Sequence, residues 1–194
     1  METIRLATWI DAPVERCFLL SLSIDLHVAS TGKSQEKAID GVTTGLISEG
    51  ETVTFQGRHF GMWRRHTSQI ELLRPYSYFR DVMIAGAFRH FEHDHHFAPM
   101  DDGTRMRDEL RFVLPWGLLG QLAAKMFVRN YLTELLTERN AVIKRVAESE
   151  EWRRYLDGGM EGQTAPPAKG VATERWDGKA MLANSRLDAP PRHG

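Results

Sequence analysis

Five strand-like segments in succession, followed by one long amphipathic stretch, constrain the fold of this chain most strongly. Polar and apolar residues alternate within the segments, as is typical of strands with one buried and one exposed face. Only turn signals separate the segments, so the pattern predicts antiparallel pairing between neighbours. The segments are Glu51–Gly57, Met62–Leu73, Tyr76–Ala85, Arg89–Phe97 and Thr104–Leu114.

The stretch after the last segment predicts a long helix. Apolar residues recur every three or four positions from Leu119 to Val146, with charged residues on the other side. The pattern reaches at least Ala147 and extends toward Leu156. A sheet and one helix can bury their apolar faces together if the sheet curves and the helix lies across its concave side. That arrangement leaves a cavity, which favours ligand binding over a scaffold role.

Four further elements are predicted before the meander. Thr3–Ile10 alternates as a strand, and Asp11-Ala12-Pro13 signals a helix start, because proline is tolerated in a first helical turn. A second short helix is predicted over Ile24–Ala29, and a short strand near Lys37–Asp40.

Composition excludes several classes of protein. With 25 basic and 26 acidic residues, the chain lacks the basic excess of a nucleic-acid-binding protein. The single cysteine, Cys17, excludes an internal disulfide framework and fits a reducing cytoplasm. No apolar run of about 18 residues predicts a transmembrane helix, and the N-terminus lacks the apolar core of a signal peptide. A soluble cytoplasmic protein is expected.

Composition also divides the chain. Residues 1–157 are expected to form the folded domain. Residues 158–194 are rich in proline, glycine and alanine, which predicts a mostly disordered tail. Docking of a protein partner through a motif around Arg175–Leu187 is an alternative use of this tail.

Four ionisable residues are predicted on the core side of adjacent strands: Asp81, His93, His95 and Asp108. Because burying such groups without partners is costly, they are expected to pair with one another. A hydrogen-bonded patch that shapes a pocket is the favoured interpretation. General acid–base catalysis is the main alternative. No metal site or cofactor is predicted, because the spacing of the two histidines fixes no third ligand.

The neighbouring residues of the same histidine-rich run alternate onto the opposite face. His90, Glu92, Asp94 and His96 are therefore predicted to face solvent, which argues against a metal-binding box made from the whole run. The inward positions of the strands and helix, in contrast, predict an adaptable apolar pocket wall. The predicted ligand-binding residues are Phe55, Met62, His66, Phe79, Met83, Phe91, Leu110, Phe112, Leu122 and Met126.

A set of short motifs between residues 3 and 147 resembles a known superfamily. They are Ala12-Pro13-Val14-Glu15, Arg58-His59-Phe60-Gly61, Phe79-Arg80-Asp81, Phe88 followed by His93-Asp94-His95-His96-Phe97, Gly103-Thr104-Arg105-Met106-Arg107-Asp108, and Leu114-Pro115-Trp116-Gly117-Leu118-Leu119-Gly120. In this order they resemble the SRPBCC superfamily, the START-like helix-grip proteins that include pollen-allergen-like carriers and polyketide cyclase/dehydrase-type proteins.

The resemblance implies an α+β fold. A seven-stranded curved antiparallel sheet would wrap around the long C-terminal helix, with two short helices near the N-terminus. It also implies a deep apolar pocket for a lipid, sterol, quinone, polyketide or similar molecule. It implies no single activity, and no catalytic residue carries over, because catalytic members use different pocket residues.

Two classes of function therefore stay open. The first is a carrier or sensor of a small apolar ligand. The second is a cyclase- or dehydratase-like enzyme that uses Asp81, His93, His95 or Asp108. A partner-binding module acting through the tail is a third, less supported alternative.

Overall fold

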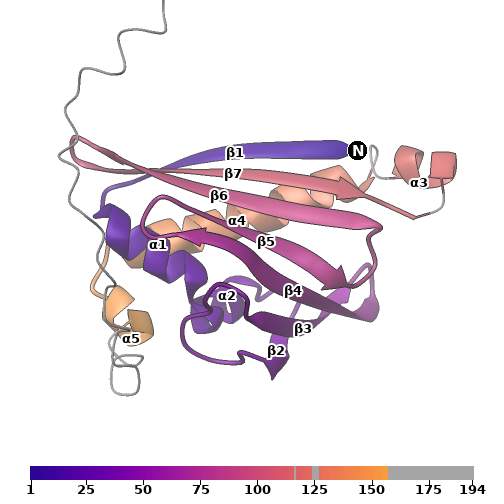
Figure 1. The fold of residues 1–194 in the computed structure, drawn as a ribbon, viewed down its shortest axis with the longest axis horizontal. Coiled ribbons are helices and arrows are strands. Elements are labelled where there is room, and N and C mark those ends of the chain that lie inside the picture. The colour runs from indigo at the N-terminus through magenta and orange to yellow at the C-terminus, as the bar shows by residue number, and fades with distance from the viewer. Residues whose placement is uncertain (116, 124–126, 157–194) are drawn as a thin grey trace, which may run out of the picture. The chain divides into compact units, whose positions relative to one another are not determined.

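Seven strands form one antiparallel sheet in the computed structural model of the protein (Figure 1). The structure describes residues 1–115, 117–123 and 127–156, so the predicted tail lies outside the described residues. The strands are β1 (Glu2–Ile10), β2 (Lys37–Gly41), β3 (Thr52–His59), β4 (Met62–Arg74), β5 (Tyr78–Ala85), β6 (His90–Met100) and β7 (Gly103–Val113).

The order of the strands in the sheet is β1-β7-β6-β5-β4-β3-β2. Strands β2 to β7 pair with their neighbours in the chain, as the predicted meander requires. β1 then pairs antiparallel with β7, from Glu2 opposite Phe112 to Ile10 opposite Thr104. The seven-stranded antiparallel sheet expected from the resemblance is confirmed, including the short strand β2.

The turn between β3 and β4 shows how local sequence sets the register. His59 pairs with Met62, so only Phe60 and Gly61 form the loop, and both have positive φ, 51° and 79°. A two-residue hairpin loop with two positive φ values matches the right-handed twist of its strands. Glycine adopts this conformation without strain, which is why the chain turns here.

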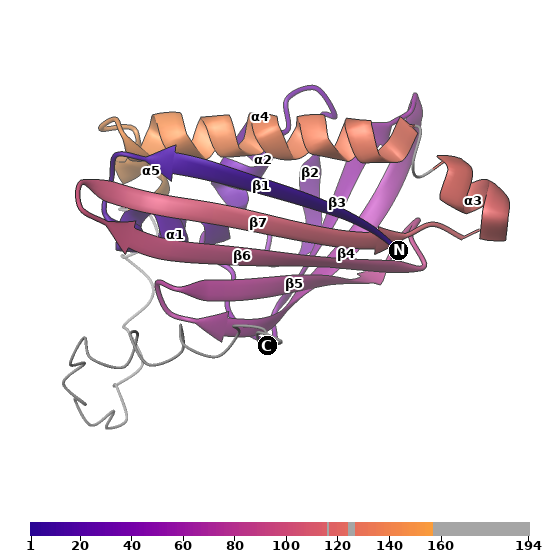
Figure 2. The same ribbon diagram turned by 90° about the horizontal axis from the view of Figure 1, so that it is seen from above.

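Four helices contact the sheet or one another. α1 (Val14–Leu22) and α2 (Ile24–Ser30) are separated by Ser23, whose hydroxyl caps α2 by accepting from the Leu26 amide. α4 (Arg129–Ala147) runs across the open side of the curved sheet (Figure 2). Its buried residues follow helical spacing and are Leu136, Asn140, Ile143, Val146 and Ala147. The short α5 (Trp152–Leu156) contacts α1.

The predicted helix is not one element along its whole apolar pattern. α3 (Gly117–Ala123) lies beyond the ends of the strands in both views (Figures 1 and 2). Leu119 and Leu122 are 78% and 57% exposed, because α3 has no strand beneath it. Helical periodicity predicted helical structure over these residues, but it did not predict a separate helix or the exposure of its apolar side chains.

The outer face of the sheet also departs from the prediction. Asp94 was expected to face solvent, yet it is 2% exposed. Its carboxylate accepts hydrogen bonds from Arg80 Nε and Arg111 Nη2, each at 2.7 Å, and from the Tyr78 hydroxyl. Two long arginine side chains from the adjacent strands cover this short carboxylate. Alternation along the strand therefore predicted the correct face of the sheet for Asp94, but not its burial.

Buried apolar residues form two clusters. The larger one centres on Phe18 of α1, which packs edge-on against Phe79 and Phe97. The smaller one contains Ile4, Leu110, Phe112, Leu114 and Leu136. Both contribute side chains to the cavity described below. None of the described helices is long and apolar enough to cross a membrane.

Candidate functional site

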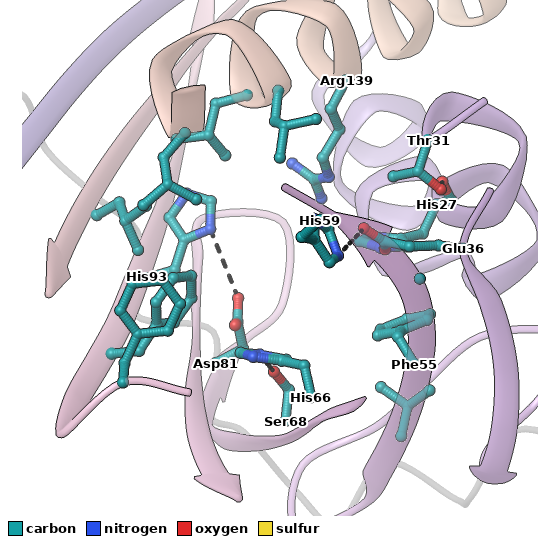
Figure 3. A pocket seen from close by; sticks show the side chains of 18 of the residues that line it. His27, Thr31, Glu36, Phe55, His59, His66, Ser68, Asp81, His93 and Arg139 are labelled. Carbon is teal, nitrogen blue, oxygen red and sulfur yellow. Dashed lines mark hydrogen bonds and ion pairs between the residues drawn. The ribbon is translucent and has the colours of Figure 1, made fainter. Parts of the chain in front are cut away.

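A cavity of about 640 Å³ lies between the sheet and α4 (Figure 3). Strands β3 to β7 and helices α1, α2 and α4 all supply lining residues. Most of its wall is apolar, and the apolar lining residues include Leu22, Ile24, Ile47, Val53, Phe55, Ile70, Phe79, Phe88, Phe91, Leu110, Leu114, Leu132, Leu135 and Leu136. The size and character of the cavity suit a small organic molecule.

The structure brings six of the ten predicted ligand-binding residues to this wall. They are Phe55, Met62, His66, Phe79, Phe91 and Leu110. Their contact with a ligand stays a prediction. His66 lies among them with Nε2 2.8 Å from Ser68 Oγ, and burial lowers its pKa.

The other four lie elsewhere or outside the described residues. Met83 folds over the β5–β6 turn, where its sulfur occupies the space that a Cβ on Gly86 would need. Phe112 points inward but is fully buried in the smaller core cluster, edge-on to Phe88. Leu122 is exposed on α3, and Met126 lies outside the described residues.

Asp81, His93, His95 and Asp108 meet on three adjacent strands, and we call them the Asp–His cluster. The register places Asp81 opposite His93 and His95 opposite Asp108. His93 Nε2 lies 3.1 Å from Asp108 Oδ1, and His95 Nε2 lies 3.0 Å from Asp81 Oδ2. His95 Nδ1 is 2.9 Å from Asp108 Oδ1, but its orientation does not suit a hydrogen bond. Each imidazole therefore lies between two carboxylates.

Charge within the cluster follows from this arrangement. Burial opposes ionisation of Asp81, but the hydrogen bond from His95 and the charges of both imidazoles outweigh it and lower its pKa to about 2. Burial also opposes ionisation of Asp108, whose pKa His93 and His95 nevertheless hold well below its usual range. Burial lowers the pKa of His95, and the two carboxylates more than reverse this effect and raise it. Burial and the neighbouring His95 lower the pKa of His93. The arrangement favours a charged His95 beside a neutral His93.

Helix α4 adds two polar side chains next to the cluster. Asn140 Nδ2 donates to Asp108 Oδ2 at 2.7 Å, which fixes the orientation of that carboxylate. Arg139 reaches into the cavity (Figure 3), where its Nη2 donates to the Ser21 carbonyl at 3.1 Å. Its Nη1 is buried and has no hydrogen-bond partner among the described residues. A ligand with an acceptor group could satisfy this nitrogen.

A second polar cluster, which the sequence did not predict, lies on another part of the wall. Glu36 Oε2 is 3.0 Å from His27 Nε2, and Glu36 Oε1 is 3.4 Å from His59 Nε2. His59 Nδ1 is in turn 2.7 Å from the Tyr131 hydroxyl. These residues come from α2, the segment before β2, the end of β3 and the start of α4. No periodicity links such distant positions, so only the three-dimensional structure reveals them.

Glu36 gives a prediction about acid stability. Burial opposes its ionisation, but the His27 hydrogen bond and the charges of His27 and His59 lower its pKa below 4.5. A carboxyl group with a lowered folded-state pKa stabilises the fold above its unfolded pKa, and loses that contribution as the pH falls through the folded value. We therefore expect the free energy of unfolding to fall less steeply below pH 4.5 in Glu36→Gln than in the unmodified protein. Urea unfolding over a pH series measures this change.

Glu134→Gln is the matched control, because Glu134 is exposed and pairs at the surface with Lys33 alone among the residues that the structure describes. If the free energy of unfolding falls with pH below 4.5 in the same way in Glu36→Gln and in the unmodified protein, the prediction is contradicted.

Comparison with known proteins supports the fold. No protein-family model matches the sequence, and no curated protein matches it either. Solved structures do match. A protein from Thermus thermophilus is 19% identical with a TM-score of 0.59, covering 73% of this chain and 97% of its own. The protein Ara h 8.0201 is 10% identical with a TM-score of 0.55, covering 73% of this chain and 97% of its own. A START superfamily protein from Mycobacterium smegmatis is 9% identical with a TM-score of 0.57, covering 74% and 98%.

These matches are too distant in sequence to transfer an activity, and they extend over nearly the full length of the matched chains. Their TM-scores, all above 0.5, show a shared overall fold. The chain therefore has the helix-grip fold shared by START-like and pollen-allergen-like proteins, as its motifs suggested.

Proposed function

We propose that the protein binds one small, mainly apolar molecule in the cavity and acts as a carrier or sensor of it. The cavity itself carries this proposal, since about 640 Å³ lined mostly by aliphatic and aromatic side chains lies within the usual range for small-molecule sites. Burying an apolar surface of that extent is a strong driving force for binding. A lipid, quinone, sterol or polyketide-like compound would fit this description.

Polar groups on the wall restrict the ligand further. The Nη1 of Arg139, which has no acceptor among the described residues, calls for an acceptor or an anionic group, and the Asp81 carboxylate can accept a hydrogen bond on the strand side. A ligand with an apolar body and one oxygen-bearing end would satisfy both features. Such a molecule would bind in a single orientation, because unpaired buried polar groups are costly.

Native mass spectrometry of the purified protein, followed by organic extraction, is the direct test of this proposal. We expect a stoichiometric apolar compound, or saturable binding of 1-anilinonaphthalene-8-sulfonate, an apolar fluorophore with one anionic group. Leu132→Trp should lower the affinity for this probe at least about tenfold, because the added ring fills space in the cavity.

Leu119→Trp adds the same ring to the exposed α3 and is the matched control. Both variants should keep a cooperative unfolding transition. Equal affinity for the fluorophore in Leu132→Trp and Leu119→Trp would place the probe outside the cavity and contradict the proposal.

The Asp–His cluster supports a second candidate, a cyclase- or dehydratase-like enzyme. Asp81, His93 and His95 line the same cavity, so a bound molecule would lie beside groups able to move protons. Asp108→Asn and His93→Gln separate the two functions. An enzyme should lose turnover of the extracted compound in both variants, whereas a carrier should keep its affinity and show no turnover in any form.

We also propose that the folded domain comprises residues 1–157 and works in the cytoplasm, which its single buried cysteine supports. A role of residues 158–194 in docking a protein partner stays a proposal based on composition.

A further inference from the structure

Three nitrogen and oxygen atoms converge at one point on the cavity wall. Asp81 Oδ2 lies 3.0 Å from His95 Nε2 and 3.8 Å from His93 Nδ1, and ligand atoms of all three residues lie within 4.8 Å of one another. Ligands bound to one ion at about 2.1 Å are separated by roughly 3.0–3.5 Å. Small side-chain adjustments would bring these three atoms into such a geometry. We propose that Asp81, His93 and His95 bind one divalent transition-metal ion.

The His93 imidazole is already held in the orientation that metal binding requires, and Asp108 lies on the far side of both imidazoles from Asp81. The ring nitrogens that face away from Asp81, His93 Nε2 and His95 Nδ1, lie 3.1 and 2.9 Å from Asp108 Oδ1. Asn140 fixes that carboxylate from the other side. Metal-bound histidines commonly direct their second nitrogen to a carboxylate, which sets the tautomer and strengthens the ligand. Asp108 would therefore orient His93, and a small rotation of the His95 ring would let the same carboxylate accept from His95 Nδ1, without contacting the ion.

The position of the three residues leaves room for a further ligand. Asp81, His93 and His95 line the cavity, and Asp108 does not. Asp81 and His93 project toward each other across this wall (Figure 3). Three protein ligands on one side of an ion leave its remaining coordination positions open toward the cavity, as in sites that bind a water molecule or a substrate. An oxygen on the cavity ligand could then coordinate the ion directly.

The chemistry of these ligands restricts the ion. Two imidazoles and one carboxylate suit Zn²⁺, Fe²⁺, Mn²⁺ or Co²⁺, whereas Ca²⁺ and Mg²⁺ prefer oxygen ligands throughout. The Glu36 cluster also combines a carboxylate with two histidines, but there His27 and His59 approach different oxygens of the carboxylate. The Asp–His cluster is the place where the described residues present ligand atoms to a common point.

Titration of the chelator-treated full chain with Zn²⁺ and Co²⁺ tests the proposal without any organic ligand. We expect one equivalent of either ion to bind and to raise the melting temperature. Bound Co²⁺ should show intense visible absorption, because a site of low coordination number intensifies bands that are weak in the hexaaqua ion. Asp108→Asn should weaken binding about 10–100-fold, as expected for a carboxylate that orients the ligands. Asp81→Ala and His93→Ala should weaken it further.

His90→Ala is the matched control, since His90 belongs to the same histidine-rich strand but is exposed on the other face. It should bind the ion as the unmodified protein does. Failure of the unmodified protein to bind Zn²⁺ or Co²⁺ would overturn the proposal. This outcome does not depend on whether any variant folds. Binding that survives Asp81→Ala and is lost in His90→Ala would overturn it as well, by placing the ion on the outer face. Either result leaves the proposed binding of an apolar molecule untouched.

Discussion

Asp108→Ala is expected to lower the free energy of unfolding of the metal-free protein by about 3–5 kcal/mol, the usual cost of removing one partner from a buried charged pair. Asp108 is 2% exposed and contacts His93, His95 and Asn140, which are themselves 5%, 1% and 2% exposed. Its loss would leave these groups buried without their shared acceptor. Urea unfolding monitored by circular dichroism measures the change.

Asp108→Asn separates the loss of charge from the loss of an acceptor. The amide oxygen of the asparagine side chain can still accept one hydrogen bond. We therefore expect Asp108→Asn to lower the free energy of unfolding less than Asp108→Ala does. Equal stability of Asp108→Ala and the unmodified protein would show that the cluster does not stabilise the fold.

Phe112→Ala is expected to destabilise the protein by a similar amount, about 3–5 kcal/mol, the usual range for a buried phenylalanine. The ring is fully buried among Ile4, Leu110, Leu114 and Leu136, so its removal would create a new void in packed surroundings. The same urea unfolding experiment measures this change in the free energy of unfolding. The comparison requires that the dependence on urea concentration be the same in both proteins.

Phe91→Ala provides the contrast. Phe91 is only partly buried and lines the cavity beside His66, so its truncation enlarges a space that already exists. We expect a loss of about 1–2 kcal/mol, because fewer packing contacts disappear. A larger loss for Phe91→Ala than for Phe112→Ala would contradict the division between core and cavity wall.

Alternation along the strands was enough to predict most of the fold. Side chains two apart point to the same face, which placed Asp81, His93, His95 and Asp108 on one side of three strands from the sequence alone. The resemblance supported the short strand near Lys37–Asp40, which is β2, and added that all seven strands belong to one curved sheet. The distant matches to solved structures confirm this arrangement.

The remaining differences have specific physical causes. Register shifts between Thr67 and Ser68 and between Ile70 and Leu72 interrupt the period of β4, and Leu73 beyond them packs against the core. The exposure of Asp94 was predicted wrongly, because alternation along one strand does not show that long side chains on neighbouring strands cover a short one. The Glu36 cluster was missed because its members meet only after the sheet and the helices have assembled.

The chain order of the Asp–His cluster has a consequence for how the protein folds. Asp81, His93, His95 and Asp108 come from three strands joined by two short turns, so little loop-closure entropy opposes their meeting. The pairing of Glu2 with Phe112 instead joins the first and last strands of the chain, β1 and β7, a contact of high sequence separation that slows folding. We expect the β5–β7 hairpins to form first. The polar cluster would then be a product of local folding, whereas the cavity beside it would exist only after the first strand and α4 have docked.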